Sequence, residues 1–146
     1  MSPLDRAVLA ERTMALRRHL ARVAEKLPAR PEDLIASTDA ADAVILHLWQ
    51  ATQIVIDLAV AACAVRQIGT PQGYADAFRR LQHAGLLDPE VADRLVGAAG
   101  FRNIVAHADE TIDMKRVHRS ATNGPADLAA FVAAIERLTE PTRSSE

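Results

Sequence analysis

Hydrophobic positions recur along this chain at three- and four-residue steps, which is the spacing of one face of an α-helix. The clearest stretch runs from about Ser37 to Gln67 and would be about 43 Å long at 1.5 Å per residue. Ser37-Thr38-Asp39 supplies capping side chains at its start, and Gly69-Thr70-Pro71 ends it. Its apolar positions form one stripe: Ala41, Val44, Ile45, Leu48, Thr52, Val55, Leu58, Ala59, Ala62 and Val65.

Three further apolar residues of this helix, Trp49, Ile54 and Ile56, lie outside the stripe. The helix is therefore apolar on more than one face and needs more neighbours than a small bundle offers. Pairing of two identical faces is the commonest way to cover such a surface. We therefore predict a homodimer.

The rest of the chain predicts shorter helices separated by Pro and Gly. Within one of them, Gly97 and Gly100 cost helix stability but allow a neighbour to approach closely. Before the long helix we expect a helix with Ser2 as cap and Pro3 at its first position, which ends at Pro28, and then a turn or loop over Glu32 to Ala36. After the long helix we expect a helix from Tyr74 to Ala84, and one that begins at Asp88-Pro89-Glu90 and continues through Ile104 and Val105. A short helix from Asp113 should break at Asn123-Gly124-Pro125, and a last helix should run from Asp127 to Leu138. This pattern predicts an all-α fold, an antiparallel bundle of about five helices that forms one domain over residues 1–140, with a disordered tail at 141–146.

Composition narrows the class of protein. The 146 residues are 49% hydrophobic and 25% charged, as in an ordinary globular domain, and the net charge is -2. A chain without net positive charge can bind nucleic acid only through a local cluster of basic residues. The single Cys63 cannot form an internal disulfide. This indicates either a reducing cytoplasm or a protein whose stability does not depend on the redox state of its compartment. The N-terminal stretch has no signal-peptide core and no apolar window reaches about 20 residues, so we expect a cytoplasmic protein without a membrane segment.

The familiar signatures of phosphate loops, zincins and zinc fingers do not occur in the sequence. We expect neither a metal nor a cofactor, because the histidines lie more than ten residues apart and their spacing does not suggest a metal site. They are His19, His47, His83, His107 and His118.

One segment, Gly100 to His107 (GFRNIVAH), places an Arg, an Asn and a His close together at the end of an apolar helix. Asn103 and His107 are four residues apart and share a helix face. Arg102 and His107 are five residues apart, about 140° around the helix axis, so they point in different directions. Either the long Arg102 side chain extends around the helix toward His107, or a helix of a partner supplies the other side of the site. The same residues would also suit an ordinary helix end, with His107 favouring the helix dipole and the other two in solvent.

This segment, in an all-α chain of this size, resembles the Arg-x4-6-His signature of the HEPN superfamily. The Ser37-Thr38-Asp39 opening of the long helix and Ile112-Asp113 after the motif are similar to the HepT-like branch, over nearly the whole chain. The resemblance implies a homodimeric, metal-independent ribonuclease that serves as a toxin, with a minimal nucleotidyltransferase as antitoxin and RNA as substrate. It assigns catalysis to Arg102 and His107, with Asn103 in a supporting role.

The implied chemistry suits these side chains. A neutral imidazole can take the proton of an RNA 2′-hydroxyl as general base, and a guanidinium can stabilise the charge that builds on phosphate oxygens. HepT-like toxins commonly carry a Tyr two residues after the His, which the antitoxin adenylylates. Here Asp109 occupies that position, and the only tyrosine, Tyr74, lies far back in the chain. Either simple complex formation neutralises the protein, or it is a catalytically silent HEPN dimer that binds a nucleotidyltransferase partner or a nucleotide.

Other residues offer weaker candidates. Asp57 belongs to a polar arc of the long helix, either as part of a solvated stripe or as a group that orients Arg102 from across the bundle. Cys63 is expected to be a small core residue, and Trp49 to lie in the core or an interface instead of stacking on a base. Lys115 and Arg116, with Arg119 nearby, would bind RNA phosphate or simply form a charged helix start.

Overall fold

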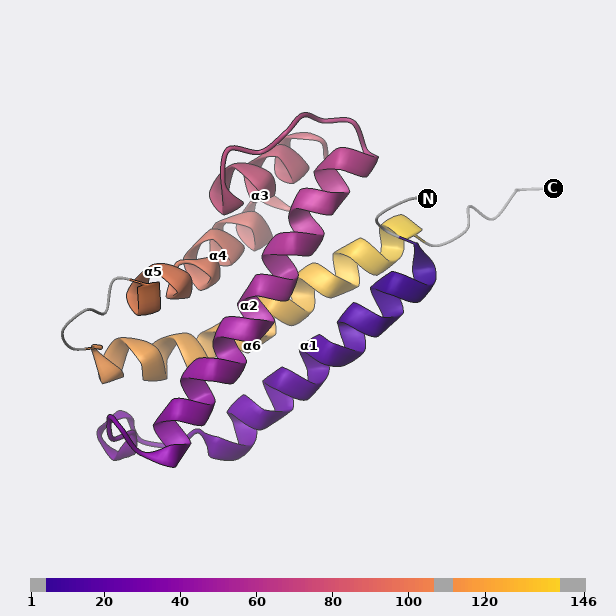
Figure 1. The fold of residues 1–146 in the computed structure, drawn as a ribbon. Helices are drawn as coiled ribbons and strands as arrows, with labels where there is room; N and C mark the ends of the chain where they lie inside the picture. The colour runs from indigo at the N-terminus through magenta and orange to yellow at the C-terminus, as the bar shows by residue number, and fades with distance from the viewer. Residues whose placement is uncertain (1–4, 107–111, 140–146) are drawn as a thin grey trace.

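The computed structural model describes residues 5–106 and 112–139 of the chain. These residues form an all-α bundle in which no strand occurs, as predicted (Figure 1). Its elements are α1 (Arg6–Lys26), a 3-10 turn η1 (Pro31–Asp33), α2 (Asp39–Val65), α3 (Tyr74–His83), α4 (Pro89–Ala99), α5 (Phe101–Ala106) and α6 (Met114–Thr139).

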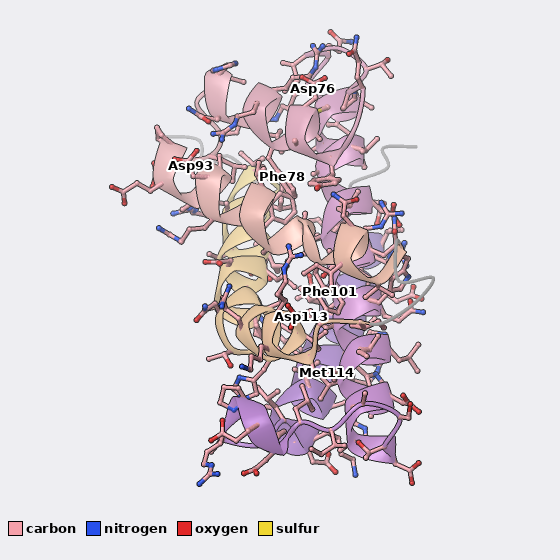
Figure 2. All side chains as sticks on the ribbon, turned by 90° about the vertical axis from the view of Figure 1, so that its left-hand side faces the viewer. Asp76, Phe78, Asp93, Phe101, Asp113 and Met114 are labelled. Carbon is pink, nitrogen blue, oxygen red and sulfur yellow. The ribbon has the colours of Figure 1, made fainter. Side chains whose placement is uncertain are left out.

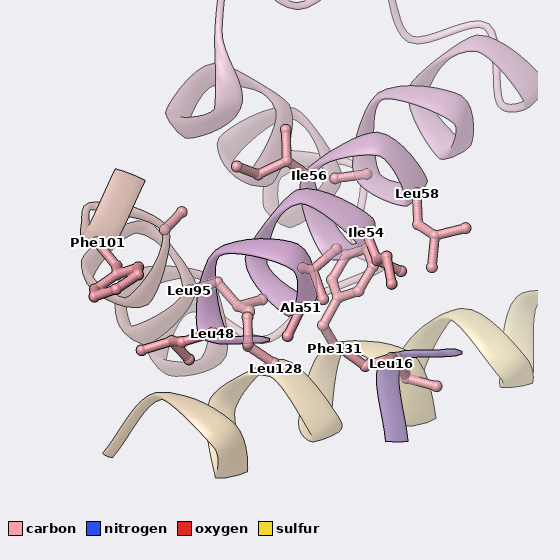
Figure 3. Close-up of a cluster of buried hydrophobic side chains, with 14 of the residues drawn as sticks. Leu16, Leu48, Ala51, Ile54, Ile56, Leu58, Leu95, Phe101, Leu128 and Phe131 are labelled. Atoms are coloured by element: carbon pink, nitrogen blue, oxygen red, sulfur yellow. The ribbon is translucent and has the colours of Figure 1, made fainter. Parts of the chain in front are cut away.

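Helix α2 is the centre of the bundle and contacts each of the other five α-helices described (Figure 1). Buried side chains from all sides meet on it, and they form one continuous core (Figure 3). Members of this cluster labelled in Figure 3 include Leu16 of α1, Leu48 of α2, Leu95 of α4, Phe101 of α5 and Phe131 of α6. At about 1.5–3 kcal/mol for each fully buried large apolar side chain, this cluster is the main stabilising term of the fold.

The expectation that no segment has the composition of a membrane span was wrong for α2. Its most apolar 18-residue window has a mean hydropathy of 1.6, which is enough by length and composition alone. Within the protein, 56% of that window is buried against the other helices. A central core helix has this composition for the same physical reason as a membrane span, because it is surrounded by apolar groups.

The predicted bounds of α2 are confirmed almost to the residue. Thr38 is the N-cap, and its Oγ1 accepts a hydrogen bond from the backbone N–H of Ala41 at 3.2 Å. After Val65 the chain turns at Gln67, which has a φ of 57°, and at Gly69, which has a φ of 97°. The start of α1 differs from the prediction, since Asp5 caps it by accepting from Ala7 N at 2.8 Å. Ser2 and Pro3, as well as residues 141–146, lie outside the described residues.

Two predictions about interruptions in the second half of the chain were wrong. The helix expected from Asp88 through Val105 is divided at Gly100 into α4 and α5. The break expected at Asn123-Gly124-Pro125 does not occur, because α6 runs through it without interruption.

Packing explains why α6 continues through a sequence that usually breaks a helix. A proline inside a helix costs about 3 kcal/mol. Buried side chains lie on both sides of Pro125, with Val117 and Ala121 before it and Leu128 and Phe131 after it. Keeping all four in one core stripe is worth more than that cost, since each large one contributes about 1.5–3 kcal/mol. The core therefore overrides the local signal.

Candidate functional site

The short helix α5 carries the first part of the Arg-Asn-x3-His segment. Phe101, which is 1% exposed, anchors its first turn in the core beside the start of α6 (Figure 2). Just before it, the Gly100 N–H donates to the carbonyls of Val96 at 3.2 Å and Gly97 at 3.1 Å, which closes α4. A Cβ atom at Gly100 would stand 3.0 Å from the Gly97 carbonyl oxygen, closer than such contacts normally allow. Glycine at this position lets one helix end and the next begin immediately.

Arg102 lies against α2 and faces the only tryptophan of the chain. Its guanidinium carbon is 5.3 Å from the centroid of the Trp49 ring, a cation–π arrangement. The Nε–H of Arg102 is buried and has no hydrogen-bond partner in the described part of the chain. Buried polar groups in folded proteins are almost always paired. An arginine with an unsatisfied donor among the described residues is a candidate for binding an anion.

Asn103 points to a different neighbour. Its Nδ2 donates a hydrogen bond of 3.1 Å to the hydroxyl oxygen of Tyr74, the first residue of α3 and the only tyrosine of the chain. The backbone N–H of Asn103 donates to the Gly100 carbonyl at 2.9 Å. The two adjacent motif residues are thus held by aromatic side chains from two separate helices. The sequence predictions missed both supports, because nothing local links residues 49 and 74 to residues 102 and 103.

The remaining motif residues, His107 and Asp109, lie outside the described residues. The predicted approach of His107 to Arg102 and Asn103 therefore stays a prediction. Lys115 and Arg116 are exposed in the first turn of α6, which packs beside α5. Their backbone N–H groups donate to Asp113 Oδ1 at 3.0 and 3.4 Å, so Asp113 caps α6 and the two basic side chains remain in solvent. Their role in RNA binding also stays a prediction.

Asp57 does not orient Arg102. It accepts a hydrogen bond of 2.8 Å from Gln53 Nε2, and it lies 3.7 Å from Arg12 Nη2 of α1. About half of the Asp57 side chain is exposed, as expected of a solvated stripe. The prediction for Cys63 is confirmed: it is fully buried, and this burial raises the pKa of its thiol, which keeps it protonated.

A pair of histidines joins α1 to α2 on the side of α2 away from Trp49. His19 Nδ1 and His47 Nδ1 are 3.0 Å apart, so one ring nitrogen donates a hydrogen to the other and the accepting ring must be neutral. Desolvation lowers the pKa of His19, and the nearby His47 and Arg18 lower it further. The charged form of His19 is therefore disfavoured in the folded protein.

The arrangement of helices matches that of known toxins. One solved structure, a MntA–HpeT toxin–antitoxin complex, superposes with a TM-score of 0.78 over 88% of this chain and 97% of that one, at 23% identity. Another, a tri-AMPylated HEPN toxin from Shewanella oneidensis in complex with an MNT antitoxin, gives 0.74 over 88% and 96% of the two chains, at 20% identity. The fold is therefore that of the HEPN toxins.

Sequence comparison identifies the branch. The model of the family described as "Ribonuclease HepT-like" matches residues 16–135. The mRNA nuclease HepT of Shewanella oneidensis is 28% identical over 95 residues, which are 65% of this chain and 71% of that protein. This chain belongs to the HepT-like ribonuclease family.

Proposed function

We propose that this protein is a metal-independent endoribonuclease toxin of a toxin–antitoxin pair, and that it acts in the cytoplasm. The observation that carries the proposal concerns Arg102, which lies in the Arg-x4-His segment of a HepT-like chain and whose buried Nε–H has no partner among the described residues. A fixed cation of this kind suits the negatively charged phosphate of RNA. The relative named an mRNA nuclease supports the same class of substrate.

The proposed reaction needs only groups of the protein, the substrate and water. The His107 imidazole takes the proton of an RNA 2′-hydroxyl, and the 2′-oxygen attacks the adjacent phosphorus. The bond from phosphorus to the 5′-oxygen breaks, the leaving oxygen takes a proton from water to become a 5′-hydroxyl, and His107 releases to solvent the proton that it took. Arg102 stabilises the negative charge on the phosphate oxygens as it builds up. The other product end is a 2′,3′-cyclic phosphate.

The active species is proposed to be a homodimer. Ile54 and Ile56, two of the residues that suggested self-association, are each only 6% exposed within one protomer and do not need a second copy. Leu46 at 52% and Val60 at 41% remain exposed on α2 and are apolar surface that a second copy would cover. Sedimentation that shows only monomer at micromolar concentration would refute the dimer.

A nucleotidyltransferase is the proposed antitoxin, since the HEPN toxin of Shewanella oneidensis was solved in complex with an MNT antitoxin. With Asp109 at the usual tyrosine position, neutralisation by formation of the complex is the form of control that fits this sequence. The same Asp109 and the net charge of -2 favour one alternative, a silent dimer that binds its partner but leaves RNA intact.

Incubation of the purified protein with RNA in excess EDTA separates these two functions. The ribonuclease produces RNA fragments at the same rate with and without the chelator. A requirement for added magnesium would refute the metal-independent mechanism. Intact RNA under both conditions, together with stable binding of a nucleotidyltransferase, would identify the silent dimer instead.

A further inference from the structure

Outside the Arg-x4-His segment, two aromatic side chains contact its described polar residues. Trp49 of α2 lies under Arg102, and Tyr74 of α3 accepts a hydrogen bond from Asn103. They are the only tryptophan and the only tyrosine in 146 residues, of which just 3% are aromatic. Neither is fully buried. Both pack against the edge of the core, and each also contacts one polar residue of the motif.

The length of α5 explains why such supports are needed. A helix of six residues is too short to be stable without tertiary contacts, so it cannot by itself fix the direction of a long side chain. Phe101 holds the first turn through the core, but it does not orient its neighbours. Arg102 and Asn103 are adjacent in sequence and point about 100° apart on the helix. Each therefore needs its own contact.

Neither contact satisfies all the hydrogen-bonding groups of the two side chains. A ring under a guanidinium touches its flat face, while the N–H groups that recognise phosphate lie in the plane of the guanidinium. The Nε–H of Arg102 has no acceptor among the described residues. Stacking on Trp49 therefore fixes the guanidinium but gives this N–H no hydrogen-bond partner. Likewise, the hydrogen bond from Asn103 Nδ2 to Tyr74 fixes the amide and leaves its carbonyl oxygen to accept from another group.

We propose that Trp49 and Tyr74 are positioning residues of the ribonuclease site: Trp49 fixes the guanidinium of Arg102, and Tyr74 fixes the side-chain amide of Asn103. This inference rests on the proposed function. Neither aromatic residue takes part in proton transfer. They keep the motif residues in the geometry of the reaction before RNA arrives, which lowers the barrier because no reorganisation is needed during the step.

Kinetics of three variants test the positioning role. Trp49→Leu and Tyr74→Phe are expected to lower kcat by up to about 100-fold, since misplaced catalytic groups carry penalties of that size. KM should change much less, because the lost interaction matters mainly in the transition state. Trp49→Phe keeps an aromatic face under Arg102 and is expected to recover most of the kcat that Trp49→Leu loses.

Phe78→Leu is the matched control for a structural effect. Phe78 lies on α3 like Tyr74, is fully buried, and meets Phe131 at a ring distance of 5.7 Å. This variant is expected to lower the melting temperature while kcat, measured where the protein is folded, stays at the wild-type value. Equal loss of kcat in Phe78→Leu and Trp49→Leu would show that the aromatic residues contribute only to packing, and would overturn the proposal.

Fluorescence of Trp49 gives a readout that does not depend on activity. As the only tryptophan, it reports on Arg102 directly, so Arg102→Leu is expected to change its emission. Arg94→Leu, on α4 and paired with Asp127 at 3.1 Å, is expected to leave the emission unchanged. Unchanged emission in Arg102→Leu would show that the stack does not form in solution and would overturn the proposal.

The two experiments separate this inference from the proposed function. RNA left intact by the wild-type protein refutes the ribonuclease and, with it, the catalytic part of the inference, while the fluorescence still decides whether Trp49 holds Arg102. Cleavage at wild-type kcat by both Trp49→Leu and Tyr74→Phe refutes the inference alone.

Discussion

His47 and Trp49 are two residues apart in α2, yet the contacts they make differ in kind. His47 faces α1 and is hydrogen-bonded to His19, so each ring supplies the hydrogen-bond partner of the other. Trp49 faces α5 and supports Arg102, whose buried Nε–H has no partner among the described residues. Leu48, between them, is buried against α6. Three consecutive residues of a core helix thus make a hydrogen-bonded polar contact, an apolar contact, and a contact to a charged group with an unsatisfied donor. Only the last of these still has hydrogen-bonding capacity for a ligand.

The largest effect is expected at the contact with the unsatisfied donor. Arg102→Ala or His107→Ala should lower RNA cleavage by about 10²–10⁴-fold, the range for lost charge stabilisation or general base catalysis. The double variant should be little worse than the worse single one, because the two groups act as a unit. For Arg102→Ala the melting temperature should hardly change, since Arg102 is not part of the buried hydrophobic core. Cleavage at the wild-type rate by either single variant would remove that residue from the mechanism.

A smaller effect is expected on the apolar side, at Gly124. A Cβ atom there would lie 3.9 Å from Leu48 Cδ1, an ordinary van der Waals distance, and the backbone is helical. Gly124→Ala should therefore change the free energy of unfolding by less than about 1 kcal/mol, because the gain in helix propensity is opposed by crowding between the new Cβ and the ring of Pro125.

Gly85→Ala is the control for this prediction. Gly85 has open space around it but a φ of 79°, where alanine is strained, so the same substitution should destabilise the protein. Urea denaturation of both variants measures the two changes in the free energy of unfolding. A loss at Gly124→Ala as large as the loss at Gly85→Ala would mean that α6 is interrupted at the Asn-Gly-Pro sequence.

The smallest effect is expected at the histidine pair. The pKa of His19 is lower in the folded protein than its usual 6.5, because burial and the neighbouring positive groups disfavour the proton. The unfolded chain therefore binds more protons below that pH, and stability should fall as the pH drops through about 6.5 toward the lower folded value. His19→Gln should flatten this part of the curve of melting temperature against pH. An unchanged slope in His19→Gln would show that the pair does not titrate as described.

Features of this structure that are set by neighbouring residues can be predicted from the sequence, whereas features set by contacts between distant residues cannot. The bounds of α2 follow from Thr38 as a cap and Gly69-Thr70-Pro71 as a stop, so periodicity and turn residues suffice. Gly100 and Gly124 are both helix-weakening residues in the sequence, but the first divides a helix and the second does not. The sequence predicted the reverse at both places, because the packing around each glycine is not visible in the local sequence.

The candidate site divides in the same way. Arg102 and Asn103 stand out because they are close to His107 in one segment. Trp49 and Tyr74 do not, since they come from α2 and α3 and reach the motif only through the fold. Asp57 was open to two interpretations from sequence, and the structure decides for the solvated stripe, because that face of α2 is turned to Arg12 of α1.

The chemical end left on the RNA tests the central claim most directly. Wild-type protein in EDTA, given a ribose oligonucleotide and the same sequence with 2′-O-methyl groups, separates attack by the substrate's own oxygen from attack by water. We predict that only the ribose form is cut, and that its fragments end in 2′,3′-cyclic phosphate and 5′-hydroxyl groups. Cleavage of the 2′-O-methyl form, or fragments that carry a 3′-hydroxyl, would contradict the account, because the 2′-oxygen would then not be the nucleophile.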